Sequence, residues 1–297
     1  MSTKGRSLEL FFIDGRPDGM LTAEVFNWTG HVLRLPRIQL KDALARKQAG
    51  YTGVYILQGE KDGQPLAYIG EAEDLSLRLK SHAAQKDWWD TAVLITSAAN
   101  NLHKAHVKYL ESRLVEIADG IKATNLENSN VPPRSSLSEA DFANMESFLE
   151  TLRMVLPAIR VDMFIDNTRS ASGELEARTE AIEFVLSTPR AGVNATALLT
   201  GGEMIVQVGS IARGTWVGDL AYKTSYHKLY NELRSNGVLE TFGKHTRFTR
   251  NYAFSSPSAV GTIVNGRSTN GRTSWKTKSC GKTYADWEAE QLLKAAT

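Results

Sequence analysis

Two hydrophobic spacings alternate along the first half of the chain. Short apolar runs predict strands at 8–13, 52–59, 66–72 and 91–98. Apolar residues that recur every three to four positions predict helices over 40–48, 75–84 and 102–118. This mixture predicts an α/β or α+β fold in which a small antiparallel sheet is flanked by helices.

The two central strands are expected to form a hairpin, because the segment EKDGQP between them carries a Lys-Asp-Gly turn. With the turn centred near Lys61 and Asp62, Tyr55 and Tyr68 are expected nearly opposite each other, so that both hydroxyls reach one site. Asp74 directly precedes the next helix and is expected to cap its first turn.

A polar break follows the third predicted helix. Residues 125–133 end in two prolines, which helices do not readily cross. A helix is expected to restart after them, because Ser138 and Asp141 resemble a capping box and apolar residues follow at helical spacing up to Pro157. We therefore expect a helical connector between two domains.

The second half of the chain also mixes helical and strand patterns. They predict a helix over 175–186, a hairpin whose strands flank Gly201 and Gly202, and a helix over 226–234. A second α+β domain is therefore expected. The predicted divisions are an N-terminal extension of strand and helix (1–49), a central domain (50–133), the helical connector (134–160) and the C-terminal α+β domain (161–297).

Length and composition agree with two folded domains. The 297 residues exceed the usual size of one domain, and contents of 42% hydrophobic and 23% charged residues exclude wholesale disorder. The single cysteine, Cys280, excludes an internal disulfide and has no companions for a zinc site. No apolar run approaches eighteen residues and no secretory signal is recognised, so we expect a cytoplasmic protein without a membrane partner.

Charge is distributed unevenly although the net charge is only +2. The stretch from 241 to 285 contains basic residues and no Asp or Glu, which makes it a candidate phosphate-binding surface; the alternative is a solvated basic face. The candidate nucleic-acid-binding residues are Lys244, Arg247, Arg250, Arg267, Arg272, Lys276, Lys278 and Lys282.

An ordered set of residues in the central domain carries a resemblance. Gly53-Val54-Tyr55 is followed by Tyr68-Ile69-Gly70, and then by Arg78, His82, Glu111 and Asn125. This order and spacing over about 51–125 resembles the GIY-YIG nuclease family. The resemblance implies a metal-dependent DNA endonuclease that hydrolyses a phosphodiester bond, with Mg²⁺ or Mn²⁺ as cofactor and duplex or branched DNA as partner.

The residues also support an anion-handling site without the family. Arg78 and His82 are four positions apart on a predicted helix and therefore share a face. Glu111 falls within the apolar stripe of its helix, where a carboxylate must be paired or metal-bound, and Mg²⁺ commonly takes one or two protein carboxylates. Taken singly, each residue is more ordinarily a packing or surface residue; the ordered set is what favours the functional interpretation.

The resemblance implies that Glu111 holds the metal ion and that Tyr55, Tyr68, Arg78, His82 and Asn125 complete the catalytic set. Arg78 would balance charge in the transition state, and either tyrosine is a candidate base, assisted by His82. Some relatives carry Lys directly after the second tripeptide, whereas this chain has Glu71. A Lys-assisted version of the mechanism is therefore not expected.

The C-terminal domain resembles a domain of unknown function that often follows GIY-YIG domains, through segments such as Phe254-Ser255-Ser256-Pro257, Asn265-Gly266-Arg267 and Trp275. That resemblance supplies no activity, and its basic end is expected to contribute DNA binding or target selection. The alternative for the whole chain is a catalytically idle nucleic-acid-binding or partner-binding protein. Monomer and homodimer both remain open, as do roles in restriction, repair, phage defence and mobile elements.

Overall fold

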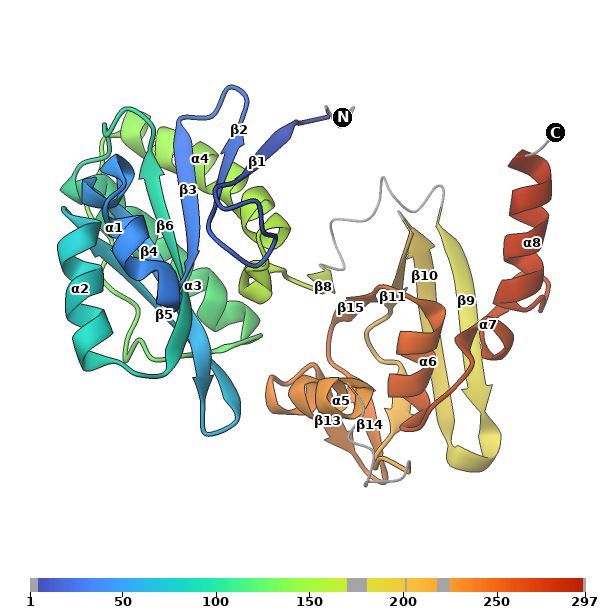
Figure 1. The fold of residues 1–297 in the computed structure, drawn as a ribbon. Coiled ribbons are helices and arrows are strands. Elements are labelled where there is room, and N and C mark those ends of the chain that lie inside the picture. The colour runs from blue at the N-terminus through green and yellow to red at the C-terminus, as the bar shows by residue number, and fades with distance from the viewer. Residues whose placement is uncertain (1–4, 170–180, 201, 218–224, 296–297) are drawn as a thin grey trace. The chain divides into compact units, whose positions relative to one another are not determined.

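The computed structural model describes residues 5–169, 181–200, 202–217 and 225–295, and divides the chain into two compact units, Met1–Ile165 and Asp166–Thr297 (Figure 1). Each unit has its own hydrophobic core and its own sheet, so the fold is mixed α+β, as the sequence predicts. The predicted segments 1–49, 50–133 and 134–160 all fall within the first unit.

The described part of the first unit contains a seven-stranded sheet in the order β1-β2-β3-β6-β4-β5-β7, antiparallel except for the β5–β7 pair. Its strands are β1 (Leu8–Phe12), β2 (Leu21–Val25), β3 (Gly30–Pro36), β4 (Gly53–Lys61), β5 (Gln64–Ala72), β6 (Trp89–Ser97) and β7 (Asn125–Leu126). Its helices are α1 (Leu40–Leu44), α2 (Leu75–Gln85), α3 (Lys104–Ile121) and α4 (Glu139–Ala158), with 3₁₀ turns at Arg37–Gln39, Lys47–Gly50 and Asp162–Phe164.

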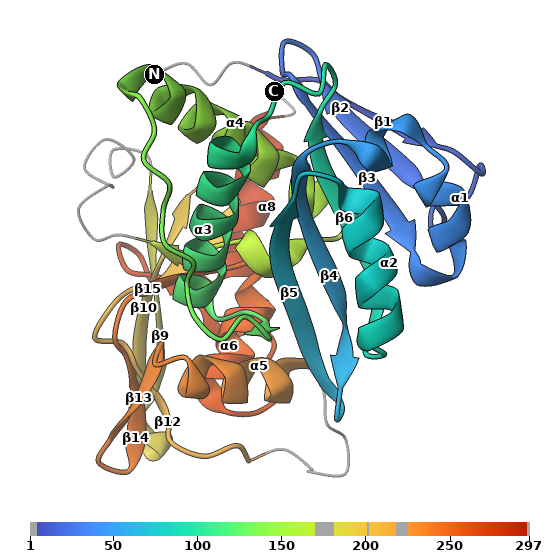
Figure 2. The same cartoon turned by 90° about the vertical axis from the view of Figure 1, so that its left-hand side faces the viewer.

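Both faces of this sheet are covered, which explains the continuous apolar run at the start of β4 (Figure 2). Val54 and Ile56 pack with α3 and α4, whereas Tyr55 and Leu57 point to the opposite face and pack with α2. The α4 helix, predicted as a connector, buries its apolar stripe in the same core. The tyrosines therefore lie on the α2 face, and α3 lies on the other.

The hairpin between β4 and β5 forms as predicted, but its turn lies one residue later. Lys61 pairs with Gln64 around Asp62 and Gly63, which both have positive φ (53° and 74°), as a two-residue type I′ turn requires. Tyr55 consequently pairs with Gly70 and not with Tyr68, so the expected opposition is wrong. The shift in pairing is two residues, and because side chains alternate with period two, both tyrosines remain on one face.

Capping residues fix where the helices of this unit begin. The Asp74 side chain accepts hydrogen bonds from the backbone N–H groups of Ser76 and Leu77, and Ser138 accepts one from Asp141, which confirms both predicted caps. Each such cap stabilises a helix by about 1 kcal/mol. The Asp74 cap matters for the site, since it sets the start of α2 directly after β5.

The second unit contains a described sheet in the order β13-β14-β12-β10-β11-β15-β8, with β9 between β10 and β16. Its strands are β8 (Thr168–Arg169), β9 (Ile182–Thr188), β10 (Val193–Thr200), β11 (Glu203–Val206), β12 (Ile211–Arg213), β13 (Leu239–Phe242), β14 (His245–Phe248), β15 (Asn251–Phe254) and β16 (Lys276–Thr277). Its helices are α5 (Ser225–Ser235), α6 (Pro257–Asn265), α7 (Gly271–Ser274) and α8 (Tyr284–Ala295), with a 3₁₀ turn at Pro189–Ala191.

Two of the three elements predicted for this unit are confirmed: β10 pairs with β11 up to Thr200 and Glu203, and α5 covers the predicted helix at 226–234. The predicted helix over 175–186 is wrong where it can be compared. Residues 175–180 lie outside the described residues, and 182–186 belong to β9. The physical reason is that Phe184 and Leu186 alternate with more exposed positions and pair with β10, a period of two and not of 3.6.

Candidate active site

Tyr55, Tyr68, Arg78 and His82 are brought together by β4, β5 and α2. The Tyr55 hydroxyl lies 2.7 Å from His82 Nε2, and Arg78 Nε donates to the same hydroxyl over 3.3 Å. The Tyr68 ring centroid lies 6.1 Å from that of Tyr55 and 5.3 Å from that of His82. The helical spacing of Arg78 and His82 places both on the tyrosine hydroxyl, as the sequence predicts.

Steric constraints explain why glycine occupies positions 53 and 70 of the two tripeptides. A Cβ built on Gly70 would overlap the Tyr55 hydroxyl, which occupies the space above that residue. A Cβ on Gly53 would overlap the carbonyl oxygen of Ile95 in the neighbouring strand. Both positions therefore admit only glycine without a shift in the sheet, and Gly70 in particular makes room for the site.

Burial sets the protonation of the two groups that share this hydrogen bond. Tyr55 is fully buried, which raises the pKa of its phenol, although the hydrogen bond from Arg78 lowers it in part. Burial, followed by the nearby positive charge of Arg78, lowers the pKa of His82 to about 4. His82 is therefore neutral at pH 7 and available to accept a proton, while its Nδ1 is buried without a hydrogen-bond partner among the described residues.

Glu111 lies on α3, on the other face of the sheet from the tyrosines. Burial raises the pKa of its carboxyl to about 7, and the negative charge of Glu71 adds to this effect. The positive charges of Lys104 and Arg78 lower that pKa in part. Arg78 is thus hydrogen-bonded to Tyr55 on one side and electrostatically coupled to Glu111 on the other.

Glu71 belongs to the same cluster and was not among the predicted site residues. Its backbone N–H donates to the Glu111 carboxylate, and both of its own carboxylate oxygens lie 2.9 Å from Lys104 Nζ. The sequence shows Glu71 as a carboxylate directly after Gly70. It does not show the contact of Glu71 with Lys104, because the two residues are 33 positions apart in the chain.

A divalent cation fits this cluster in part. The described residues contain no group of three or more His, Cys, Asp and Glu side chains arranged to hold a metal ion. Glu111 and Glu71 nevertheless place two carboxylates beside each other, and Mg²⁺ takes one or two carboxylates with water and substrate phosphate as the remaining ligands. Burial is the main cause of the raised Glu111 pKa and the charge of Glu71 the second, and a divalent cation bound here would lower that pKa.

Asn125 lies apart from these contacts. It is exposed in β7, where it pairs with Leu66 of β5. Asn128 makes the contact with the motif strand: its Oδ1 accepts from the Ile69 N–H at 3.0 Å and its Nδ2 donates to the Ile69 carbonyl at 2.7 Å. An asparagine three residues further along therefore holds the residue between Tyr68 and Gly70.

A second group of polar residues flanks Tyr68. Lys86 Nζ lies 4.7 Å from the centroid of the Tyr68 ring and forms an ion pair with Glu127, which also accepts from Trp88 Nε1 at 3.1 Å. A cation above a tyrosine face is attracted to the ring and holds it in place. Trp88 therefore has a polar role at the site, beyond packing against the sheet.

Half of the predicted basic surface is paired within the second unit. Arg247 pairs with Glu240, Arg272 with Glu288, Lys278 with Glu183 and Lys282 with Glu290. Within the described residues no ion pair is found for Lys244, Arg250, Arg267 and Lys276. The stretch lacks acidic residues along the chain, but the fold brings acids to it from other elements.

The conspicuous residues of the C-terminal domain serve its fold. Ser256 caps α6, Ser258 accepts from the Gly271 N–H, and Asn270 caps α7. Trp275 is fully buried in the core and Gly266 has the positive φ of a helix C-cap. These contacts account for the residue types by local structure, so this motif provides no independent sign of chemistry.

Comparison with known proteins finds a match within the second unit. Residues 184–288 match a family model described as a domain of unknown function, DUF4357, in agreement with the predicted C-terminal domain. No match to the GIY-YIG family is found, so that resemblance rests on the residues and geometry described above. No curated protein and no solved structure matches the chain. Among the described residues, no helix is long and apolar enough to cross a membrane.

Proposed function

We propose that the first unit is a metal-dependent DNA endonuclease of the GIY-YIG type. The observation that supports this most is the position of Arg78, which donates to the Tyr55 hydroxyl and whose positive charge also lowers the pKa of Glu111 in part. One cation thereby lies close enough to act on both the tyrosine pair and the Glu111 carboxylate, without an ion pair to the latter among the described residues. Such a cation between candidate base and candidate metal ligand suits a reaction in which negative charge grows on a phosphate.

Glu111 is the residue proposed to hold the metal ion, with Glu71 beside it. A bound Mg²⁺ or Mn²⁺ would supply a Lewis acid for a phosphate oxygen. Lys104 limits the negative charge of the pair through its contact with Glu71. It places a lysine ammonium near the position after Gly70, where some GIY-YIG relatives carry a lysine in the chain itself.

The two tyrosines differ in access, which divides their proposed roles. Tyr55 is fully buried and its hydroxyl is already engaged by His82 and Arg78, whereas Tyr68 is partly exposed. We therefore propose that Tyr68 acts as the base in its phenolate form, so that it takes the proton of the attacking water and becomes a neutral phenol. Tyr55 and His82 are proposed as positioning residues that fix the Arg78 guanidinium.

The second unit is proposed to contribute DNA binding. The cations available for this are Lys244, Arg250, Arg267 and Lys276, which have no ion pair within the described residues. The four paired cations would have to exchange a carboxylate for a phosphate, which reduces their gain.

The test is a nicking assay on supercoiled plasmid, branched DNA and an RNA control, with Mg²⁺, Mn²⁺ or EDTA present. The proposal expects nicking with either cation and none with EDTA. Glu111→Gln should abolish it, whereas Asp119→Asn, an exposed acid on the same helix, should leave it unchanged. Equal nicking by wild type and Glu111→Gln would reject the proposal and favour the idle DNA-binding or partner-binding alternative.

A further inference from the structure

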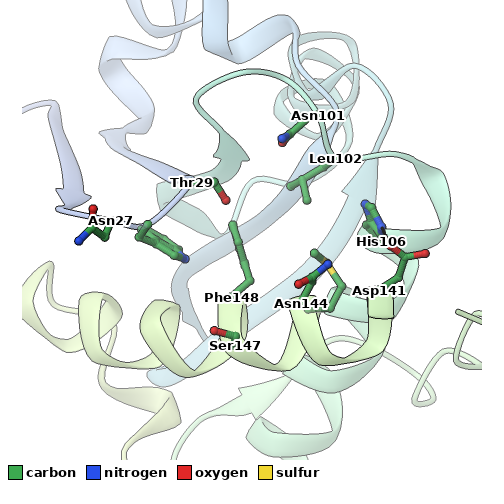
Figure 3. Close-up of a pocket in the computed structure, with 11 residues that line it drawn as sticks. Asn27, Thr29, Asn101, Leu102, His106, Asp141, Asn144, Ser147 and Phe148 are labelled. Carbon is green, nitrogen blue, oxygen red and sulfur yellow. Dashed lines mark ion pairs between the residues drawn. The ribbon is translucent and has the colours of Figure 1, made fainter. Parts of the chain in front are cut away.

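A pocket of about 320 Å³ lies in the first unit at the start of α3 (Figure 3). It is lined by the loop between β2 and β3, by the residues that lead into α3, and by one side of α4. In Figure 3, Asn144 and Phe148 rise from α4, His106 lies on the first turn of α3, and Asn101 lies on the loop that leads into that helix. The volume is at the lower end for small-molecule sites.

One wall of the pocket is apolar and partly aromatic. The rings of Trp28 and Phe148 pack with centroids 4.9 Å apart at an interplanar angle of 42°, and Leu102 and Met145 also line the pocket. Phe148 is almost fully buried, so its ring is held in place. A wall of this kind favours a planar ligand over a flexible or spherical one.

Three polar side chains that line the pocket are available to bind a ligand. The side-chain amides of Asn27, Asn101 and Asn144 have no hydrogen-bond partner within the described residues, although each can both donate and accept. Amides of this kind recognise an edge that presents a donor next to an acceptor. The pocket therefore offers several such groups to one ligand.

Two buried donors at the pocket also lack partners. Trp28 Nε1 and His106 Nε2 are buried without a hydrogen bond, and His106 is nine-tenths buried. Burial lowers the pKa of His106, so its ring is neutral, and the backbone N–H of His103 donates to Nδ1, which leaves the proton on Nε2. The nearest Asp141 oxygen is 3.6 Å away, too far for a hydrogen bond. Trp28 Nε1 thus lacks an acceptor, and His106 Nε2 has only the longer contact with Asp141 that Figure 3 marks by a dashed line.

Charge excludes two ligand classes. None of the lining residues, all within the described chain, is Lys or Arg, so a phosphate or carboxylate would find no counter-charge. Asp141 is the lining carboxylate, and a divalent cation would need more oxygen ligands than it offers. What remains is a neutral planar molecule with ring nitrogens or carbonyl oxygens as acceptors.

We propose that this pocket binds a nucleobase, presented either by a free nucleoside or by an unpaired base of single-stranded DNA. The base would lie along the Trp28–Phe148 wall and accept from the two buried N–H groups, with Asn144 and Asn101 along its polar edge. Only the single-stranded DNA source rests on the proposed function.

The pocket is separate from the proposed active site. Glu111 follows His106 by five residues on α3, which is a rise of roughly 7.5 Å and a rotation of roughly 140° around the helix axis. Binding of a base should therefore need neither a divalent cation nor the Glu111 carboxylate. This separation allows the two proposals to fail independently.

The test is an NMR titration of the full chain without divalent cation, observed at the indole N–H of Trp28, which a Trp28→Phe variant assigns. Thymidine, deoxyadenosine and a short single-stranded oligodeoxynucleotide are the probes, with inorganic phosphate and deoxyribose 5-phosphate as controls. The expected result is a saturable shift with the nucleosides, the oligonucleotide or both, and none with the two controls. A tighter response to the oligonucleotide would identify DNA as the source of the base.

Two variants make the result decisive. Asn144→Trp fills the pocket from an exposed position and should weaken binding at least tenfold, whereas Ala143→Trp adds the same bulk to the same exposed turn outside the lining and should not. Glu111→Gln should bind nucleosides as tightly as wild type even though it does not nick DNA. The proposal is overturned if no probe shifts Trp28 in saturable fashion, if phosphate shifts it equally, or if Asn144→Trp binds as tightly as Ala143→Trp.

Discussion

The hydroxyl of Tyr55 lies 2.7 Å from Nε2 of His82, and both side chains are buried. Because Arg78 donates to the same hydroxyl, the hydroxyl proton is directed to the neutral imidazole. A buried pair of this kind has no direct access to solvent. It is therefore suited to holding Arg78, and the partly exposed Tyr68 is left to meet the substrate water.

The two tyrosines should respond differently to loss of the hydroxyl. Tyr68→Phe is expected to lower the single-turnover nicking rate by about 10² to 10⁴, the usual contribution of a general base. Tyr55→Phe removes one hydrogen bond to Arg78, on the order of 1 kcal/mol, and should lower the rate about fivefold. The reverse ranking in rapid-quench measurements would assign the base to Tyr55.

The stability of the protein should depend on pH through the protonation of the Glu111 carboxyl. Burial and Glu71 raise the Glu111 pKa from 4.5 to about 7, so the folded protein keeps a proton that the unfolded chain has lost between these values. The stability that this carboxyl contributes is present below pH 4.5 and is lost as pH rises through 7. Glu111→Gln should therefore raise Tm at pH 8 and leave it unchanged at pH 4, in the absence of divalent cation.

Added Mg²⁺ should reverse the order of the Tm values of wild type and Glu111→Gln at pH 8. Mg²⁺ binds the folded state in preference to the unfolded chain and should raise the Tm of wild type at pH 8 in a concentration-dependent way. Glu111→Gln should show no such rise. If Mg²⁺ stabilises both proteins equally in differential scanning calorimetry, the cation binds elsewhere and the Glu111 site is rejected.

His82 should produce the opposite pH dependence. Its pKa falls from 6.5 to about 4 on folding, so its contribution to stability is present above pH 6.5 and is lost as pH falls through 4. In His82→Gln, the loss of Tm between pH 6.5 and 4 should be smaller than in wild type.

Gly70→Ala should affect the site more than the fold. The added methyl group meets the Tyr55 hydroxyl and must displace the Tyr55 ring or the β5 strand, at a cost of about 1 to 3 kcal/mol. Nicking should fall further than stability explains, because Arg78 loses its anchor. Gly120→Ala, where a Cβ meets nothing, should be neutral or stabilising by up to about 1 kcal/mol.

Local sequence patterns predict much of the N-terminal unit, but they do not predict the contacts between residues that are far apart in the chain. The hairpin, the Asp74 cap and the shared face of Arg78 and His82 follow from spacing within about twenty residues. The exact pairing of Tyr55 depended on which two residues form the turn, a difference of one position. The contact between Glu71 and Lys104 required the tertiary fold, which places α3 against the end of β5.

Contacts between distant residues also explain why the predictions for the C-terminal unit were less accurate. The stretch at 241–285 contains no Asp or Glu along the chain, so the sequence by itself predicts a uniformly basic surface. Glu183 and Glu290 lie outside that stretch and reach Lys278 and Lys282 through the fold. The strand at 182–188 was missed because its alternation is short, and its partners are set by sheet pairing.

The last prediction separates the paired from the unpaired cations of this surface. Each phosphate neutralised by a protein cation releases condensed counterions, so log K falls against log salt with a slope near −0.9 per contact. Replacing Lys244, Arg250, Arg267 and Lys276 by Ala should weaken DNA binding and flatten that slope by roughly 0.9 for each residue that contacts a phosphate.

The matched control removes the same charge from the paired set, Arg247, Arg272, Lys278 and Lys282. These cations already interact with glutamates, so DNA must displace a carboxylate before it gains a phosphate contact. Their replacement should change the slope less than replacement of the unpaired set, although both variants lose four positive charges. The slopes are measured by fluorescence-anisotropy titrations from about 50 to 300 mM salt, a range that spans the physiological value of about 150 mM. Equal changes of slope in the two variants would show that net charge alone governs binding. No change in either variant would mean that this surface does not contact DNA, and a protein partner or a second copy of the chain would take its place.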